Sequence, residues 1–153
     1  MENKTYQNWR VVSTVQLGAS AEEVWKLVGG FYILPQWHPD ITLSEVPEKQ
    51  PDEKEIRRVL TFPGQAPTVE QLVFMDNENF HYRYKWHAGP WGEQVQQYKA
   101  EIKILELDAS GNSCVVQWSS TFWYFEDALT QFYKNGFDNL LKIFGPATHT
   151  NQP

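Results

Sequence analysis

Residues 80–87 read FHYRYKWH, a stretch in which every second side chain is aromatic and those between are histidine, arginine or lysine. Successive side chains of a β-strand point to opposite faces of the sheet. The stretch therefore predicts a strand with one aromatic face and one polar face. We expect the aromatic face to be covered by another layer of the protein and the polar face to contact water. The covered set is Phe80, Tyr82, Tyr84 and Trp86.

Further strands are expected on both sides of this one. The next strand alternates in the same way, and its inward set is Gln96, Tyr98, Ala100, Ile102 and Ile104. Short segments rich in Gly, Pro, Asp and Asn mark the turns between strands. The expected strands are residues 11–17, 41–46, 55–62, 68–75, 80–87, 95–107 and 114–124. Consecutive strands joined by short turns form an antiparallel meander.

Helical patterns occur near both ends of the chain. Ser20 followed by Glu23 is a capping box, which predicts a helix over residues 21–28. Residues 31–37 form a second short apolar segment, which we interpret as one or two helical turns. Over residues 126–144 the apolar spacing becomes helical and predicts one long amphipathic helix.

Together these elements predict an α+β fold of the helix-grip type. A curved antiparallel sheet of about seven strands wraps around the long C-terminal helix, and two short helices follow the first strand. The whole chain, residues 1–153, is expected to form a single domain of this kind. Its ordered core is expected to span about residues 9–145.

The composition limits the classes of function. The net charge of −6 disfavours nucleic acid and anionic membranes as partners, because binding to both depends largely on an excess of Lys and Arg. Cys114 is the only cysteine, which excludes an internal disulfide and indicates a reducing, cytoplasmic location. No apolar run reaches membrane-spanning length and residues 1–10 are polar, so we expect no signal peptide or membrane anchor.

Aromatic residues make up 15% of the chain, and the expected inward faces also carry polar atoms. These polar groups come from Glu70, Tyr82, Tyr84, Gln96, Tyr98 and Ser120. A buried polar group without a partner costs about 1–3 kcal/mol, so a packed core avoids such groups. Any single tyrosine is more easily explained by a hydroxyl that reaches solvent at the end of the sheet. As a set, they predict a cavity for a small molecule.

The inferred ligand is a small, largely apolar metabolite, aromatic or lipid-like, held by a carrier or binding protein. Rings of the sheet and of the C-terminal helix would form the walls. The residues expected at this site are His38, Arg57, Glu70, Tyr82, Tyr84, Trp86, Tyr98, Trp118, Ser120, Leu129, Tyr133 and Phe137. The four histidines lack the spacing of a metal site, and no glycine motif for a nucleotide occurs in the right context. We therefore expect neither a metal nor a cofactor.

The order of elements resembles the Bet v 1-like superfamily, also called START-like or SRPBCC, over residues 11–144. The similarity is greatest to its polyketide cyclase/dehydrase and lipid-transport branch. The motifs that carry the resemblance are AEEVW (21–25), WHP (37–39), EIRRV (55–59), VEQL (69–72), YRY (82–84), QYKA (97–100) and VQWS (116–119). The resemblance implies the helix-grip fold. It does not specify an activity, because one fold supports many functions.

The resemblance also implies roles for individual residues. His38 stands where hormone-receptor members have a lysine that pairs with the ligand carboxylate, and Arg57 and Glu70 match residues implicated in proton transfer in an enzyme member. This implies an alternative function, a cofactor-independent cyclase, dehydrase or isomerase in which Glu70 is the general acid/base and Arg57 assists. The resemblance favours Arg57 as the inward arginine, whereas strand alternation favours Arg58, and both remain open. Residues 62–67 and 91–93 match the lid loops of the receptors in position.

Overall fold

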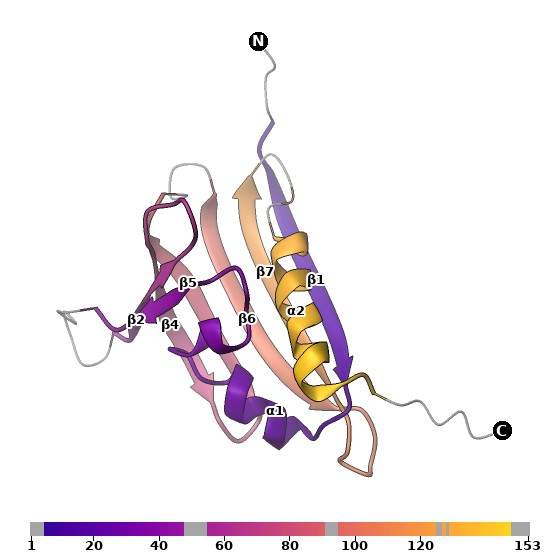
Figure 1. Ribbon diagram of the computed structural model, residues 1–153. Coiled ribbons are helices and arrows are strands. Elements are labelled where there is room, and N and C mark those ends of the chain that lie inside the picture. The colour runs from indigo at the N-terminus through magenta and orange to yellow at the C-terminus, as the bar shows by residue number, and fades with distance from the viewer. Residues whose placement is uncertain (1–4, 48–54, 91–94, 125–126, 128, 148–153) are drawn as a thin grey trace.

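The computed structural model describes residues 5–47, 55–90, 95–124, 127 and 129–147. Seven strands and two α-helices, with one short 3₁₀ helix, follow one another in the order expected (Figure 1). Their bounds are β1 Gln7–Leu17, α1 Ala21–Val28, η1 Leu34–Gln36, β2 Leu43–Glu45, β3 Arg57–Thr61, β4 Thr68–Asp76, β5 His81–Ala88, β6 Gln96–Glu106, β7 Cys114–Tyr124 and α2 Thr130–Phe144.

The strands form one antiparallel sheet in the order β1-β7-β6-β5-β4-β3-β2. The last strand of the meander pairs with the first, so β1 lies next to β7 at one edge. Helix α2 lies across β7 and β1 on one face, and α1 lies near one end of the same face (Figure 1). The predicted helix-grip fold is confirmed. Within the described residues, no helix is long and apolar enough to cross a membrane.

The predicted alternation holds along β5. Tyr82 and Tyr84 are buried against the helix side, whereas Arg83 and Lys85 are exposed on the outer face. At the start of β6 it fails. The pairing register shifts between Gln96 and Lys99, and Gln96 lies opposite the outward Trp123. The expectation that Gln96 faces inward is therefore wrong, because a β-bulge changes which face a residue occupies.

Helix α1 has the predicted bounds, whereas the other two helical segments are shorter than the sequence patterns indicate. The Ser20 hydroxyl accepts a hydrogen bond from the Glu23 backbone N–H at 3.1 Å, as the capping box predicts. The segment 31–37 contains only one 3₁₀ turn, with Pro35 at its start. Helix α2 begins at Thr130, after Asp127 accepts hydrogen bonds from two backbone N–H groups. Residues 125, 126 and 128 lie outside the described residues, as does the predicted lid segment 91–93.

Helix α2 is fixed to the segment after η1 by close contact. A Cβ atom on Gly136 would lie 2.6 Å from His38 Cδ2 and 3.0 Å from Trp37 Cζ3, so only glycine permits this approach. Amide groups on either side of it extend the contact: Asn139 Nδ2 donates to the Trp37 carbonyl and Asn135 Nδ2 to the Asp40 carboxylate, both at 2.8 Å. The helix is therefore held over β7 at a defined height.

Candidate functional site

A buried ion pair joins β3 and β4 on the helix side of the sheet. Arg58 and Glu70 lie directly opposite each other in the register of the two strands. Arg58 donates from Nε at 3.0 Å and from Nη2 at 2.7 Å, and both bonds reach the same oxygen, Glu70 Oε1. Its Nη1 donates to the Phe31 carbonyl at 2.8 Å. The pair therefore has a fixed geometry with the guanidinium on the inner side.

Aromatic rings enclose the guanidinium. Its central carbon lies 4.3 Å from the ring centroid of Phe31 and 4.7 Å from that of Tyr84, within the range of cation–π attraction. Burial opposes the charge of Arg58, but the neighbouring Glu70 carboxylate, together with Tyr82 and Tyr84, outweighs this effect, so the pKa of Arg58 is raised overall. Arg58 is therefore a permanent cation with no solvent contact.

Glu70 is the member of the pair that solvent can reach. Its side chain is 9% exposed, whereas that of Arg58 is 0% exposed. Burial raises the pKa of Glu70 above its ordinary value, and Arg58 opposes part of this rise. Because both Arg58 donors use Oε1, the pair leaves Oε2 of Glu70 outside the ion-pair contact. The site thus presents a carboxylate oxygen rather than a cation.

The structure corrects the choice of Arg57 as the inward arginine. Arg57 lies on the opposite face of β3, where Nε donates to Gln71 Oε1 and Nη2 to Glu55 Oε2, each at 3.0 Å. Strand alternation had favoured Arg58, and the physical reason is the period of two along β3. Arg57 therefore cannot share a site with Glu70.

Unsatisfied polar atoms lie on the same face beside Glu70. Trp86 is the register partner of Glu70 on β5, and Thr68 precedes Glu70 by two residues on β4. Among the described residues, neither the Trp86 Nε1 nor the Thr68 hydroxyl has a hydrogen-bond partner, although both atoms are buried. Such groups are costly in a closed core and are expected where a ligand or water completes the bonding. Thr68 was missed in the sequence because threonine is common in strands.

A chain of hydroxyl groups runs from the sheet to α2. Trp118 Nε1 donates to the Tyr84 hydroxyl at 2.9 Å. The Tyr84 and Tyr98 hydroxyls are 3.4 Å apart, and the Tyr98 and Tyr133 hydroxyls 3.3 Å apart. Burial raises the pKa of all three tyrosines, so each hydroxyl keeps its proton. The chain links β5, β6, β7 and α2 through neutral hydrogen bonds.

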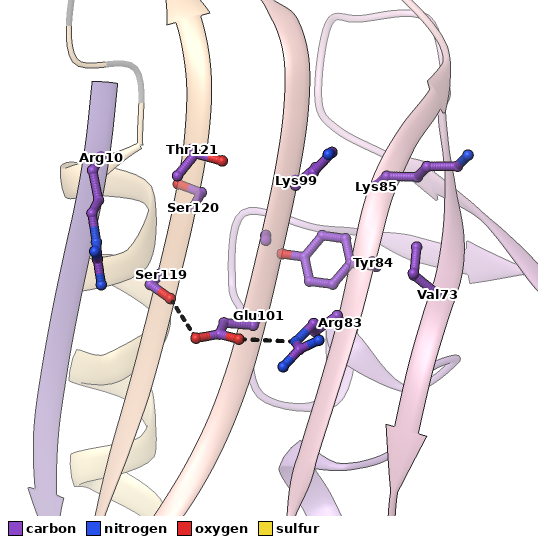
Figure 2. A pocket seen from close by; sticks show the side chains of 11 residues that line it. Arg10, Val73, Arg83, Tyr84, Lys85, Lys99, Glu101, Ser119, Ser120 and Thr121 are labelled. Atoms are coloured by element: carbon purple, nitrogen blue, oxygen red, sulfur yellow. Dashed lines mark hydrogen bonds and ion pairs between the residues drawn. The ribbon is translucent and has the colours of Figure 1, made fainter. Parts of the chain in front are cut away.

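Aromatic rings of the sheet and α2 pack against one another between these two layers. The Trp118 ring stacks on Tyr133 with centroids 4.2 Å apart, and Trp37 and Phe137 flank it at 5.3 and 6.1 Å. Ser120 and Leu129 are also buried. The structure thus brings Trp118, Tyr133 and Phe137 together, while the internal cavity stays a prediction. A pocket of about 520 Å³ does exist, but on the outer face of the sheet (Figure 2).

His38 is used by the fold itself. The Asp40 N–H donates to Nδ1 at 3.2 Å, so the ring proton is on Nε2, which donates to the Phe132 carbonyl at 2.7 Å. The ring also stacks on Phe132 with centroids 4.1 Å apart, and burial lowers the pKa of His38. A neutral histidine with both nitrogens engaged has none left for a ligand, so His38 is left out of the candidate site.

Cys114 and the acidic side chains of the described residues provide neither a reactive thiol nor a metal site. Burial raises the pKa of the Cys114 thiol to about 11, which keeps it protonated and unreactive. In the described part of the chain, no cluster of three or more His, Cys, Asp or Glu side chains has the arrangement of a metal site.

Comparison with known proteins identifies a family and solved structures that are similar to this chain. The profile of the family described as "Polyketide cyclase / dehydrase and lipid transport" matches residues 8–143. XoxI from Bacillus cereus is 26% identical with a TM-score of 0.76, covering 88% of this chain and 94% of that chain. An uncharacterized Bacillus thuringiensis protein is 25% identical with a TM-score of 0.73, covering 89% and 98%. The Zhui aromatase/cyclase from a Streptomyces species is 13% identical with a TM-score of 0.71, covering 90% and 93%, which shows similarity of fold alone. No curated protein matches the chain.

The two neighbouring arginines provide a matched test of the buried pair. Arg58→Met should lower the free energy of unfolding by about 3–5 kcal/mol, because it leaves Glu70 buried without its partner. Arg57→Met should lower it by less than about 1 kcal/mol, because its contacts are partly exposed. Urea unfolding followed by tryptophan fluorescence measures both. Equal losses in the two variants would contradict the assignment of Arg58 as the structural partner of Glu70.

Proposed function

Because the chain belongs to the polyketide cyclase/dehydrase and lipid transport family, we propose that it binds a small, largely apolar metabolite, aromatic or lipid-like, between the sheet and α2. The observation that carries this proposal is that Arg58 binds only one of the two carboxylate oxygens of Glu70. One carboxylate oxygen stays outside the ion-pair contact, and two unsatisfied donors lie on the same face. A packed core would satisfy these groups, whereas a binding site keeps them for a ligand.

The chemistry of these groups defines the ligand further. Glu70 Oε2 accepts hydrogen bonds, and the Trp86 Nε1 and Thr68 hydroxyl donate them. A flat molecule with a hydroxyl group and a carbonyl or ether oxygen would satisfy all three. A carboxylate ligand would be repelled by Glu70, because Arg58 is covered by its own partners. The preferred ligand is therefore a neutral hydroxylated aromatic or polyketide-like compound.

Entry of such a ligand requires rings at the rim of the site to move. Tyr98 and Phe132 are only partly buried, unlike the central Trp118 and Tyr133. Phe62, at the start of the predicted lid 62–67, lies 5.8 Å from Phe132 between ring centroids. We infer that this loop and the Phe132 side of α2 separate to admit the ligand. The single thiol, Cys114, supports a reducing, cytoplasmic location.

A second candidate function is proton transfer catalysed by Glu70. The observation that favours it is the raised pKa of a carboxyl group that solvent reaches only slightly. A general acid/base works best when its pKa is near the working pH. In this reading Arg58 is a positioning residue that fixes the carboxylate, in place of the role first given to Arg57.

The binding proposal predicts selectivity for a hydrogen-bond donor. Isothermal titration calorimetry should show 2-naphthol binding about tenfold more tightly than 2-methoxynaphthalene, because only the former donates to Glu70. Glu70→Gln should remove most of this difference. Glu106→Gln, an equal charge change at the exposed end of β6, should preserve it. Equal affinity of the unmodified protein for both compounds would rule out Glu70 as the ligand's acceptor.

The catalytic candidate predicts proton exchange in a model ketone. In D₂O, Glu70 would remove a proton next to the carbonyl of 2-tetralone and return a deuteron, a process that proton NMR follows directly. Glu70→Gln should reduce the rate at least about a hundredfold. If the unmodified protein exchanges these protons no faster than Glu70→Gln, the protein binds its ligand without general acid/base chemistry at this position.

A further inference from the structure

The face of the sheet opposite α2 carries a pocket of about 520 Å³ (Figure 2). Four basic side chains and two hydroxyl groups line it: Arg10, Arg83, Lys85, Lys99, Ser119 and Thr121. In Figure 2 these side chains project from β1, β7, β6 and β5, with α2 behind the sheet. The pocket is therefore separated from the proposed ligand site by the thickness of the sheet, and it plays no part in that function.

The register of the strands places the backbone positions of four of these residues in one row. Arg10 on β1 is opposite Thr121 on β7, Thr121 is opposite Lys99 on β6, and Lys99 is opposite Lys85 on β5. We call these four residues the outer basic row. Adjacent strands are about 4.8 Å apart, so the backbone of Arg10 is roughly 10 Å from that of Lys99. The row thus holds a lysine pair, a hydroxyl group and an arginine in sequence across four strands.

The positive charges of the outer basic row are not paired with carboxylates of the described residues. Within the described parts of the chain, Arg10, Lys85 and Lys99 have no ion-pair partner, and all three are exposed. Like charges directly opposite each other on neighbouring strands destabilise a sheet. Such an arrangement is unexpected in a chain whose net charge is −6, where carboxylates outnumber cations.

Among the described residues that line the pocket, Glu101 is the one carboxylate, and it already has partners. Glu101 Oε2 contacts Arg83 Nε at 3.3 Å and His81 Nε2 at 3.0 Å, and Oε1 accepts from the Ser119 hydroxyl at 3.3 Å. These contacts lower the pKa of Glu101 against the effect of its partial burial, so it is ionised at neutral pH. Glu101 therefore pairs with Arg83 and His81, which lie beside the outer basic row. The cations of the row itself are not neutralised by it.

We propose that the outer basic row binds a small soluble anion that carries two or more phosphoryl groups. The two ammonium groups of Lys85 and Lys99 would hold one phosphoryl group as point charges. The Arg10 guanidinium, which suits a bidentate contact with phosphate oxygens, would hold another, with the Thr121 hydroxyl between them. A lipid bilayer that displays phosphate is a weaker candidate, because the protein as a whole is acidic and the site is a pocket rather than a flat surface.

The test uses inorganic pyrophosphate as the probe and the full chain as the protein. At low salt, calorimetry should detect pyrophosphate binding that weakens as sodium chloride is added. The double variant Lys85→Gln/Lys99→Gln should weaken binding about tenfold or more, since it removes the pair that holds one phosphoryl group. Arg10→Gln should weaken pyrophosphate binding but should affect binding of monophosphate less, because it contacts the second group.

Lys142→Gln is the matched control for Arg10→Gln, since each removes one positive charge, and Lys142 lies at an exposed position on α2. It should leave pyrophosphate binding unchanged. Three results would overturn the proposal: no binding at millimolar pyrophosphate, equal weakening in Lys142→Gln and the double variant, or binding of phosphatidylglycerol vesicles without binding of pyrophosphate. None of these results bears on 2-naphthol binding, so the two proposals fail independently.

Discussion

A guanidinium group buried without any solvent contact is the constraint on which the helix side of this protein depends. Removing an ion from water costs several kcal/mol, and only a complete set of partners offsets that cost. Arg58 has such a set in Glu70, the Phe31 carbonyl and the faces of two aromatic rings. These partners come from β4, β5 and the segment after α1, and Arg58 itself lies on β3. The pair therefore fixes the relative positions of elements that are distant in the sequence.

The burial of Arg58 also explains why the group of the pair that a ligand could contact is the Glu70 carboxylate. The cation lies on the inner side, where rings enclose it, and the carboxylate lies on the side that solvent reaches. The hydroxyl chain from Trp118 to Tyr133 then extends the polar surface toward α2 without adding charge. A ligand between the sheet and the helix would meet neutral hydroxyl groups, aromatic faces and one carboxylate oxygen. This set of contacts suits a neutral hydroxylated ring system better than an anion.

Much of the fold was predictable from the sequence because it depends on periods of two and of about four residues, which local patterns reveal. The failures have local physical causes. Gln96 was assigned to the wrong face because a bulge shifts the register before Lys99. Arg57 was chosen over Arg58 on resemblance, although alternation indicated Arg58. The structural role of His38 depends on Phe132, which lies far along the chain and which no local pattern brings near.

Glu70 is the residue at which we propose that the ligand is recognised. The most direct measurement is the structure of the protein with 2-naphthol bound. It should show the naphthol hydroxyl within hydrogen-bond distance of Glu70 Oε2, with the Arg58 contacts to Oε1 intact and the Tyr98 or Phe132 ring displaced. A structure in which the naphthol lies elsewhere, with the Arg58–Glu70 pair and its surrounding rings unchanged, would contradict the account.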